Sequence, residues 1–177
     1  SNSENIVASV GGQVTDENGS PVNGATVSLG SETTTTNVYG TFKFKDELMN
    51  SSRVVVRVTK PGYIDGSRAV VPNATGVSNV TVQLLPENSI GSVSNAVGGV
   101  LNIAGGASVF FTSGDVANTD GTAYSGNVHV SAHYLDPTSR ETYDQMPGNL
   151  QAINLSGEQI SLATYGMMAV ELTGDSG

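Results

Sequence analysis

Short alternating runs of residues, separated by dense turn clusters, fill the first half of this chain and restrict it to few folds. Turn residues crowd Asp16–Pro21, Asn37–Gly40 and Pro61–Gly62. Between these clusters, apolar and polar side chains alternate with the two-residue period of a β-strand. Seven such runs between Ile6 and Leu84 predict a seven-stranded β-sandwich.

The alternation also predicts which side chains form the core of this sandwich. Phe42 and Phe44 share one face of their run, while Lys43 and Lys45 take the other. The polar, β-branched run Thr33–Thr36 is typical of an exposed or edge strand. We expect one core, made of Ala25, Val27, Leu29, Phe42, Phe44, Val54, Val56, Val58, Val80, Val82 and Leu84.

The length of the chain suits one large domain or two small ones, and a linker-like stretch favours two. The chain has 177 residues, of which 37% are hydrophobic; this is enough to fill a core and argues against disorder. Pro86–Ser89 has the composition of a linker. We therefore expect residues 1–87 to form the sandwich and residues 88–177 to form a second, small β-rich domain.

The charge pattern excludes two classes of partner. The formal net charge is −9, and six of the seven Lys and Arg residues lie between Lys43 and Arg68. There they alternate with core positions, so they indicate a solvated sheet face and no nucleic-acid partner. An anionic membrane would repel the chain, and no run approaches the ~20 apolar residues of a membrane helix. The absence of Cys excludes disulfides and thiolate metal sites.

The turn and strand residues together carry a family pattern. The matching residues are Gly12, Val14, Asp16, Gly19, Pro21, Val22, Gly24, Ala25, Val27, Gly40, Phe42, Gly62 and Tyr63. Through them, Gly12–Leu85 resembles the carboxypeptidase regulatory-like domain, an Ig-like sandwich of transthyretin type. Asn37 stands where the family usually has Asp, and Asn can cap the same turn. The resemblance implies a non-catalytic module of the kind found beside peptidases, outer-membrane receptors and adhesins.

Strand patterns continue in the second half, separated by longer polar loops. They cover Val97–Ile103, Ala107–Thr112, Asn127–Tyr134 and a hairpin of Leu150–Leu155 with Gln159–Leu162. Three motifs make this half similar to a segment that follows regulatory-like domains in bacterial surface proteins and in cartilage intermediate layer protein: Asp136–Thr138, Met146–Leu150 and Leu162–Leu172. This similarity indicates lineage and does not specify an activity.

The last predicted strand, Thr164–Leu172, has apolar residues on both faces. Met168, Val170 and Leu172 alternate with Met167, Ala169 and Glu171. That pattern suits a strand buried on both faces, and an apolar strand at a sheet edge would need a cover. We expect it to pair with an earlier strand or with a partner chain. We also expect the second domain to be truncated here, with chain beyond Gly177 adding the strands that complete it.

Residues that could carry chemistry are few and scattered. Gly174–Gly177 matches the nucleophile motif of trypsin-like proteases, but it lies far in sequence from His129 and His133, the only possible imidazole bases. The two histidines are four residues apart on one strand, hence ~13 Å apart, which is too far for one zinc ion. We therefore predict no catalytic residue and no metal site at these positions.

Acidic, tyrosine and asparagine residues have alternative interpretations. Asp115, Asp120, Asp136 and Asp144 lie in loops that could hold calcium, but they lack the dense spacing of a calcium loop, and Asx turns explain Asp115 and Asp120 better. A Lys–Asn isopeptide bond is excluded by the lack of Lys in Ile6–Thr15. Five glycosylation sequons begin at Asn18, Asn50, Asn73, Asn79 and Asn154; chance alone gives about three in a chain this rich in Ser and Thr, so they are not evidence of glycosylation. Turn-flanking tyrosines could bind sugar or peptide, although packing is favoured: Tyr39, Tyr63, Tyr124, Tyr143 and Tyr165.

The sequence thus predicts an all-β protein that is not an enzyme and uses no cofactor or metal. The predicted function is a structural or interaction module, of spacer or adhesion type, in an extracytoplasmic surface protein with neighbouring domains. The alternative is a module that binds a glycan or protein at the cell surface through loops of the sandwich. The residues that would bind such a partner stay unassigned.

Overall fold

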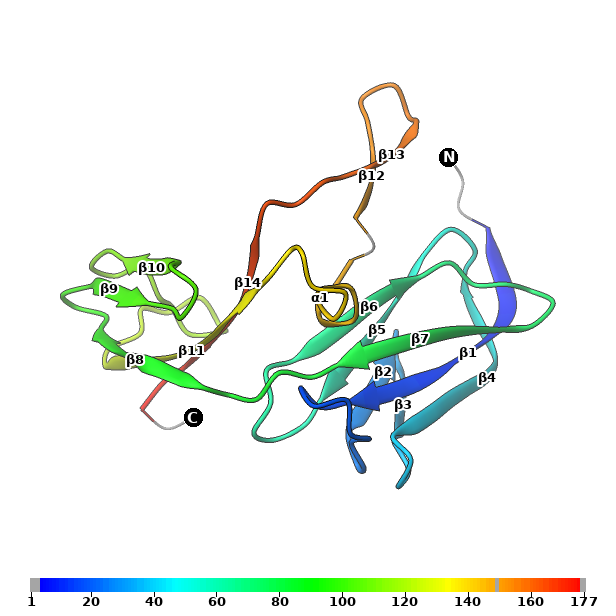
Figure 1. Ribbon diagram of the computed structural model, residues 1–177, viewed down its shortest axis with the longest axis horizontal. Coiled ribbons are helices and arrows are strands. Elements are labelled where there is room, and N and C mark those ends of the chain that lie inside the picture. Colours follow the sequence, from blue (N-terminus) through cyan, green and yellow to red (C-terminus); the bar gives the residue numbers. More distant parts are fainter. Residues whose placement is uncertain (1–3, 149, 176–177) are drawn as a thin grey trace. The chain divides into compact units, whose positions relative to one another are not determined.

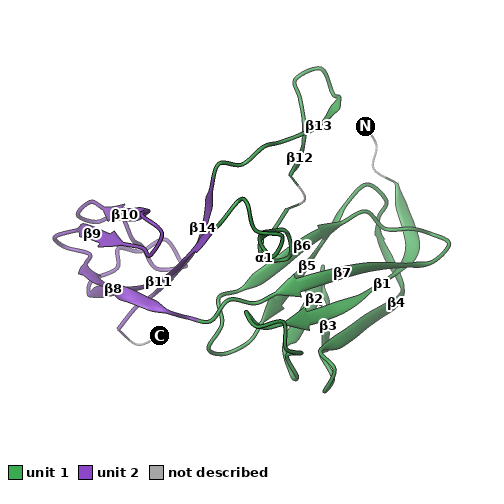
Figure 2. Ribbon diagram, in the orientation of Figure 1, with its two compact units in different colours: residues 1–86, 136–165 green, residues 87–135, 166–177 purple. Residues whose placement is uncertain are grey.

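The structure, a computed structural model, describes residues 4–148 and 150–175, and it is built almost entirely of β-strands (Figure 1). The chain forms two compact units, coloured separately in Figure 2. The first unit contains residues 1–86 and 136–165, and the second contains residues 87–135 and 166–177. Within the described part of the chain, no helix is long and apolar enough to cross a membrane.

The first unit contains the predicted seven-stranded sandwich. Its strands are β1 (Asn5–Thr15), β2 (Thr26–Leu29), β3 (Glu32–Thr35), β4 (Thr41–Asn50), β5 (Val54–Thr59), β6 (Gly66–Val70) and β7 (Val77–Gln83). One sheet has the order β4-β1-β7 and the other the order β3-β2-β5-β6. The polar strand β3 lies at a sheet edge, as its composition predicts.

The first and last strands of this sandwich run parallel. β1 is antiparallel to β4 on one side and parallel to β7 on the other. The parallel register extends from Ser9 opposite Val77 to Thr15 opposite Gln83 without a shift. The chain therefore enters this pair of strands at one end and leaves it, towards Pro86, at the other.

The core of the sandwich confirms the predicted inward positions. All the predicted residues are buried in one cluster except Val54, which is partly buried against it. Phe42 and Phe44 lie edge to face with ring centroids 6.1 Å apart, a favourable aromatic geometry. Sequence reasoning missed the contribution of further residues to the same cluster: Ala8, Val10, Val14, Val22 and Met49.

Glycines of the family pattern stand where a side chain would not fit. A Cβ on Gly12 would lie 2.1 Å from the carbonyl oxygen of Val80 on β7. Gly40 has φ +70° and closes the β3–β4 turn, where a Cβ would lie 2.4 Å from the carbonyl oxygen of Val14. In the same turn, the Asn37 side chain accepts the N–H groups of Tyr39 and Thr41, so Asn does cap it.

The second unit is a smaller β structure. Its strands are β8 (Ser89–Ser94), β9 (Gly99–Asn102), β10 (Ser108–Phe111), β11 (Asn127–Leu135) and β14 (Met167–Thr173). One sheet has the order β14-β11-β8, and β9 pairs with β10. Its buried core consists of Val93, Phe111, Val128 and Val130, with Leu101 and Tyr124 among the partly buried residues around it.

The segment 136–165 belongs to the first unit, although in the sequence it falls between β11 and β14 of the second unit. It contains α1 (Thr142–Gln145) and the hairpin of β12 (Gln151–Ile153) and β13 (Gln159–Ser161). The sequence predicted the hairpin, but it predicted a loop at α1 and a linker where β8 begins. It also placed all residues from 88 onward in one domain, a division that does not coincide with these units and stays a prediction.

The last strand pairs with β11 and lies at the edge of its sheet. Its expected pairing with an earlier strand is thus present. The strand is not buried on both faces, however, because Met168, Val170 and Leu172 are between 39% and 44% exposed. With only β11 beside it among the described strands, β14 lacks the second neighbour that would cover these side chains.

Candidate functional site

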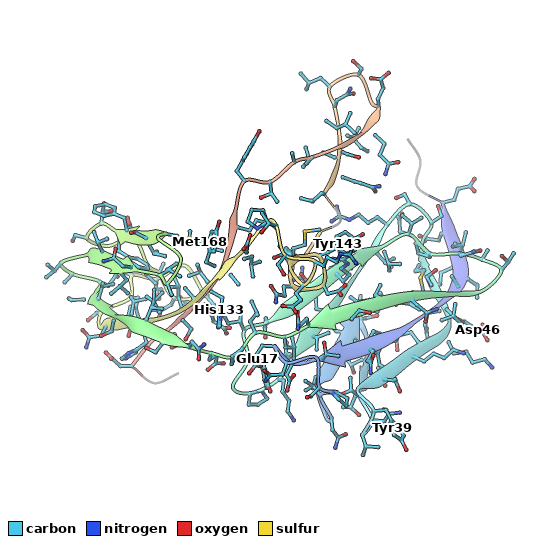
Figure 3. All side chains as sticks on the ribbon, viewed as in Figure 1. Glu17, Tyr39, Asp46, His133, Tyr143 and Met168 are labelled. Carbon is cyan, nitrogen blue, oxygen red and sulfur yellow. The ribbon has the colours of Figure 1, made fainter. Side chains whose placement is uncertain are left out.

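Arg68 on β6 is the most buried cationic side chain in the first unit, only 5% exposed. Its guanidinium donates hydrogen bonds to the main-chain carbonyls of Tyr143, Met146 (3.4 Å) and Gly148 (3.2 Å). The guanidinium carbon also lies 3.8 Å from the centroid of the Tyr143 ring, a cation–π contact. Figure 3 labels Tyr143, which belongs to α1. We call this cluster the arginine clamp.

Two further contacts support the arginine clamp. The Ala69 N–H donates to the Pro147 carbonyl at 3.2 Å, and the Gln145 side chain donates to Gln83 at 2.9 Å. Met146 is 2% exposed. The motif Met146–Gly148 therefore closes over β6, and the arginine donates hydrogen bonds to one carbonyl of α1 and to two carbonyls just beyond its end. This arrangement anchors a segment and contains no reacting group.

A second polar cluster lies in the second unit, around Asp175. Its carboxylate accepts the Asn127 N–H at 2.9 Å and lies 3.1 Å from Nε2 of His129. The Asp175 N–H donates to the Tyr124 hydroxyl at 2.9 Å, and that hydroxyl donates to the Asn127 carbonyl at 2.8 Å. The hydrogen bonds lower the pKa of Asp175, first through Asn127 and then through His129. They fasten the end of β14 to the start of β11.

The protease-like motif and the histidines do not form a catalytic group in the described residues. Asp175 of the motif meets His129, but both side chains are about half exposed (51% and 47%), and Ser176 and Gly177 lie outside the described residues. His133 lies four residues further along the same face of β11. Residues 4–148 and 150–175 contain no group of three His, Asp or Glu residues that could hold a metal ion.

The candidate calcium ligands are engaged with threonines of their own loops. Asp115 accepts hydrogen bonds from Thr112, Asp120 from Thr122 and Asp136 from Thr138, each from both the N–H and the hydroxyl. These bonds lower the pKa of each carboxyl group. At Asp120 and Asp136 they close Asx turns. Asp144 lies apart from them in α1.

The five tyrosines have different surroundings. Tyr63 packs against the core of the first unit, Tyr124 lies in the Asp175 cluster and Tyr143 in the arginine clamp. Tyr39, labelled in Figure 3, is 70% exposed in the β3–β4 turn, and Tyr165 is 96% exposed before β14.

Three of the sequon asparagines serve as turn residues. The side chains of Asn50, Asn73 and Asn154 each accept the N–H two residues ahead. An Asx turn needs a polar residue in just these positions, so turn chemistry accounts for the asparagine in these sequons.

Exposed apolar side chains are the surface feature that sequence reasoning underestimated. The β12–β13 hairpin and its flanks expose Ile153, Leu155, Ile160 and Leu162. A hollow of about 450 Å³ lies between this hairpin and β6, lined by Val70, Val71, Ala152 and Ile153 among others. In the second unit, β14 exposes Met168, Val170 and Leu172. Figure 3 labels Met168 on this strand.

Comparisons with known proteins agree with the all-β fold. Residues 9–85 match the model of the carboxypeptidase regulatory-like domain, so the sandwich of the first unit is a domain of that family. Over 60 residues, the chain is 35% identical to human cartilage intermediate layer protein 2; this stretch is 34% of the chain and 5% of that much longer relative. The predicted resemblance to the regulatory-like domain is therefore confirmed, together with a weak similarity to cartilage intermediate layer protein over a short stretch.

A solved structure gives a more distant likeness. It is a chain from the crystal structure of a type II cohesin–X–dockerin complex from Acetivibrio cellulolyticus. The alignment covers 45% of this chain and 58% of that chain at 17% sequence identity, with a TM-score of 0.35. A TM-score this low carries no argument for fold or function here.

Proposed function

We propose that this chain is a non-catalytic structural module of an extracytoplasmic surface protein, a spacer that carries mechanical load between neighbouring domains. The observation behind the proposal is the parallel pairing of β1 with β7, the first and last strands of the sandwich. The regulatory-like family assignment supports a non-catalytic role. The polar clusters support it too, because their groups fasten segments together.

The parallel pair matters because of the direction in which a load would act. A pull on residue 4 and on residue 87 acts along β1 and β7 in opposite directions. All hydrogen bonds between the two strands are then strained together, so they resist in shear. An antiparallel pair whose neighbouring ends are pulled apart would instead lose its hydrogen bonds one at a time. A spacer that carries load needs the shear geometry.

Protein binding is a second candidate function. The exposed apolar residues of the β12–β13 hairpin and the hollow beside β6 favour it, because apolar patches of this kind mark interaction surfaces. Binding of a glycan by loops of the sandwich has less support, since the two most exposed tyrosines, Tyr39 and Tyr165, belong to different loops.

Single-molecule pulling tests the spacer proposal. The chain contains no Cys, so attachment points can be introduced as Glu4→Cys with Glu87→Cys, or as Glu4→Cys with Gly76→Cys. The first pair loads β1 and β7 in shear, and the second opens them from one end. The proposal expects the first geometry to need at least about twice the unfolding force. Equal forces would remove the basis for a load-carrying role.

A further inference from the structure

The outer edge of β14 has the features of a strand that accepts another strand. β14 pairs with β11 over seven consecutive register positions without a shift, so it is regular and extended. Strands at exposed sheet edges are usually protected by Pro, Lys or a bulge. Met167–Thr173 contains no Pro and no Lys, and its pairing has no bulge.

One face of β14 is apolar and only partly covered. Met168, Val170 and Leu172 stand opposite Tyr134, Ala132 and Val130 of β11, so they share the face on which Ala132 and Val130 are buried. The core of the second unit therefore continues onto β14 but ends there, half exposed. A strand added along β14 would extend this core by one row of side chains.

A hollow beside Leu172 could receive a side chain of that added strand. It has a volume of about 290 Å³, and Val116, Tyr124, Val128 and Leu172 are among the residues that line it. All of these residues belong to the second unit. The hollow gives the apolar face a pocket in addition to its flat surface, and such pockets hold anchoring side chains in protein interfaces.

The negative charge of the second unit favours a basic partner. Its charged residues are Glu87, Asp115, Asp120, Glu171 and Asp175, and its sequence contains no Lys or Arg. A second copy of this unit would bring only like charges to the interface, whereas a basic segment would be attracted. Glu171 and Asp175 lie on or beside β14 itself.

We propose that the outer edge of β14 binds an extended, basic segment of a partner protein by strand addition. The partner's apolar side chains would lie on the face of Met168, Val170 and Leu172, and its Lys or Arg residues would alternate with them on the opposite face. This binding site is independent of the spacer role, which rests on β1 and β7 in the first unit.

The test uses the whole chain and a blocked nine-residue peptide of alternating valine and lysine. Three readouts are combined: the dissociation constant, its dependence on salt, and protection of the amides of residues 167–173 from hydrogen exchange. Two matched peptides serve as controls, one with glutamate in place of lysine and one with alternate backbone amides N-methylated. We expect the lysine peptide to protect β14 and to bind at least about tenfold more tightly than either control.

Two variants of the chain locate the site. Val170→Lys puts a charge on the accepting face and should weaken binding at least about tenfold. Val97→Lys adds the same charge to the same unit at a residue that is 78% exposed and lies outside β14, so affinity should stay within about twofold. If Val170→Lys fails to fold, the comparison with the N-methylated peptide still tests strand addition.

Three results would overturn the proposal. The first is equal binding of the lysine and glutamate peptides, which would remove the charge argument. The second is binding of the lysine peptide without protection of residues 167–173. The third is protection of β14 that rises with protein concentration in the absence of peptide and is lost in Val170→Lys, which would make a second copy the occupant.

Discussion

At the scale of single residues, the glycines of the regulatory-like pattern follow two different requirements. Gly19 and Gly40 both have positive φ, +76° and +70°. Around Gly19 an added Cβ would meet nothing within 4 Å, whereas at Gly40 it would lie 2.4 Å from the Val14 carbonyl oxygen. Gly19 therefore satisfies only a backbone requirement, and Gly40 satisfies a packing requirement as well.

This difference gives a prediction for two substitutions. Gly19→Ala should cost about 1–2 kcal/mol, the strain of a left-handed backbone with a Cβ. Gly40→Ala should cost clearly more, because β1 and the turn must also move apart. Urea unfolding of the two variants measures the difference. Equal costs would mean that the turn can relax around a methyl group.

The Asp175 cluster makes a prediction about pH. Its carboxyl pKa is lowered in the folded chain, so its contribution to stability is present above the unfolded value of ~3.9 and is lost as pH falls through the folded value. The protection factor of the Asn127 amide should therefore fall below about pH 4. In Asp175→Asn, where no carboxyl group titrates, that acid-dependent loss should disappear. An equal fall of this protection factor in both proteins would show that Asp175 does not cause the acid-dependent loss.

At the scale of elements, the arginine clamp joins β6 to the segment around α1. Replacing Arg68 with Met keeps most of the apolar stem but leaves three carbonyl groups without their donor. We expect Arg68→Met to destabilise the whole chain by about 2–4 kcal/mol, as for buried hydrogen bonds to a charged group. Arg140→Met, at an exposed arginine, is the control and should change stability by less than about 0.5 kcal/mol.

The sequence predicts an element when the residues that stabilise it are close together in the chain, and misses one that depends on distant contacts. Alternation in Thr26–Leu29 and in Thr41–Lys45 made the sandwich strands and their inward faces predictable. β8 was missed because Ser89–Ser94 is Ser-rich with few apolar residues, and it becomes a strand by pairing with β11. α1 was missed because four residues carry no helical period, and long-range contacts with Arg68 and Gln83 hold it.

Whether the candidate sites could be predicted also depends on whether their contacts are local in the sequence. The Asx turns at Asp120 and Asn73 are local and could be predicted from spacing. The arginine clamp joins residues 75 positions apart, and the Asn127–Asp175 contact joins residues 48 apart, so no local pattern marks either. The edge position of β14 depends on sheet order, which its two apolar faces cannot specify.

At the scale of the whole molecule, the chain passes between the two units three times, after residues 86, 135 and 165. The sequence-based boundary nevertheless remains a proposal that can be tested. Residues 1–88 alone contain both sandwich sheets, so the fragment should give a β spectrum and cooperative melting. It lacks the acceptors of Arg68, so we expect Arg68→Met to cost far less in the fragment than in the whole chain. A random-coil spectrum would contradict the independent-sandwich proposal.

The central claim is that the β1–β7 pair carries load, and a proline pair tests it most directly. β7 is an edge strand, so the N–H groups of neighbouring residues alternate between β1 and solvent. Ser78→Pro and Asn79→Pro each remove one N–H, but only one of the two removes a hydrogen bond to β1. The measurement is the unfolding force under the pull between residues 4 and 87. The account predicts a marked drop in one variant and little change in the other. An unchanged force in both variants would show that the parallel pair does not carry the load.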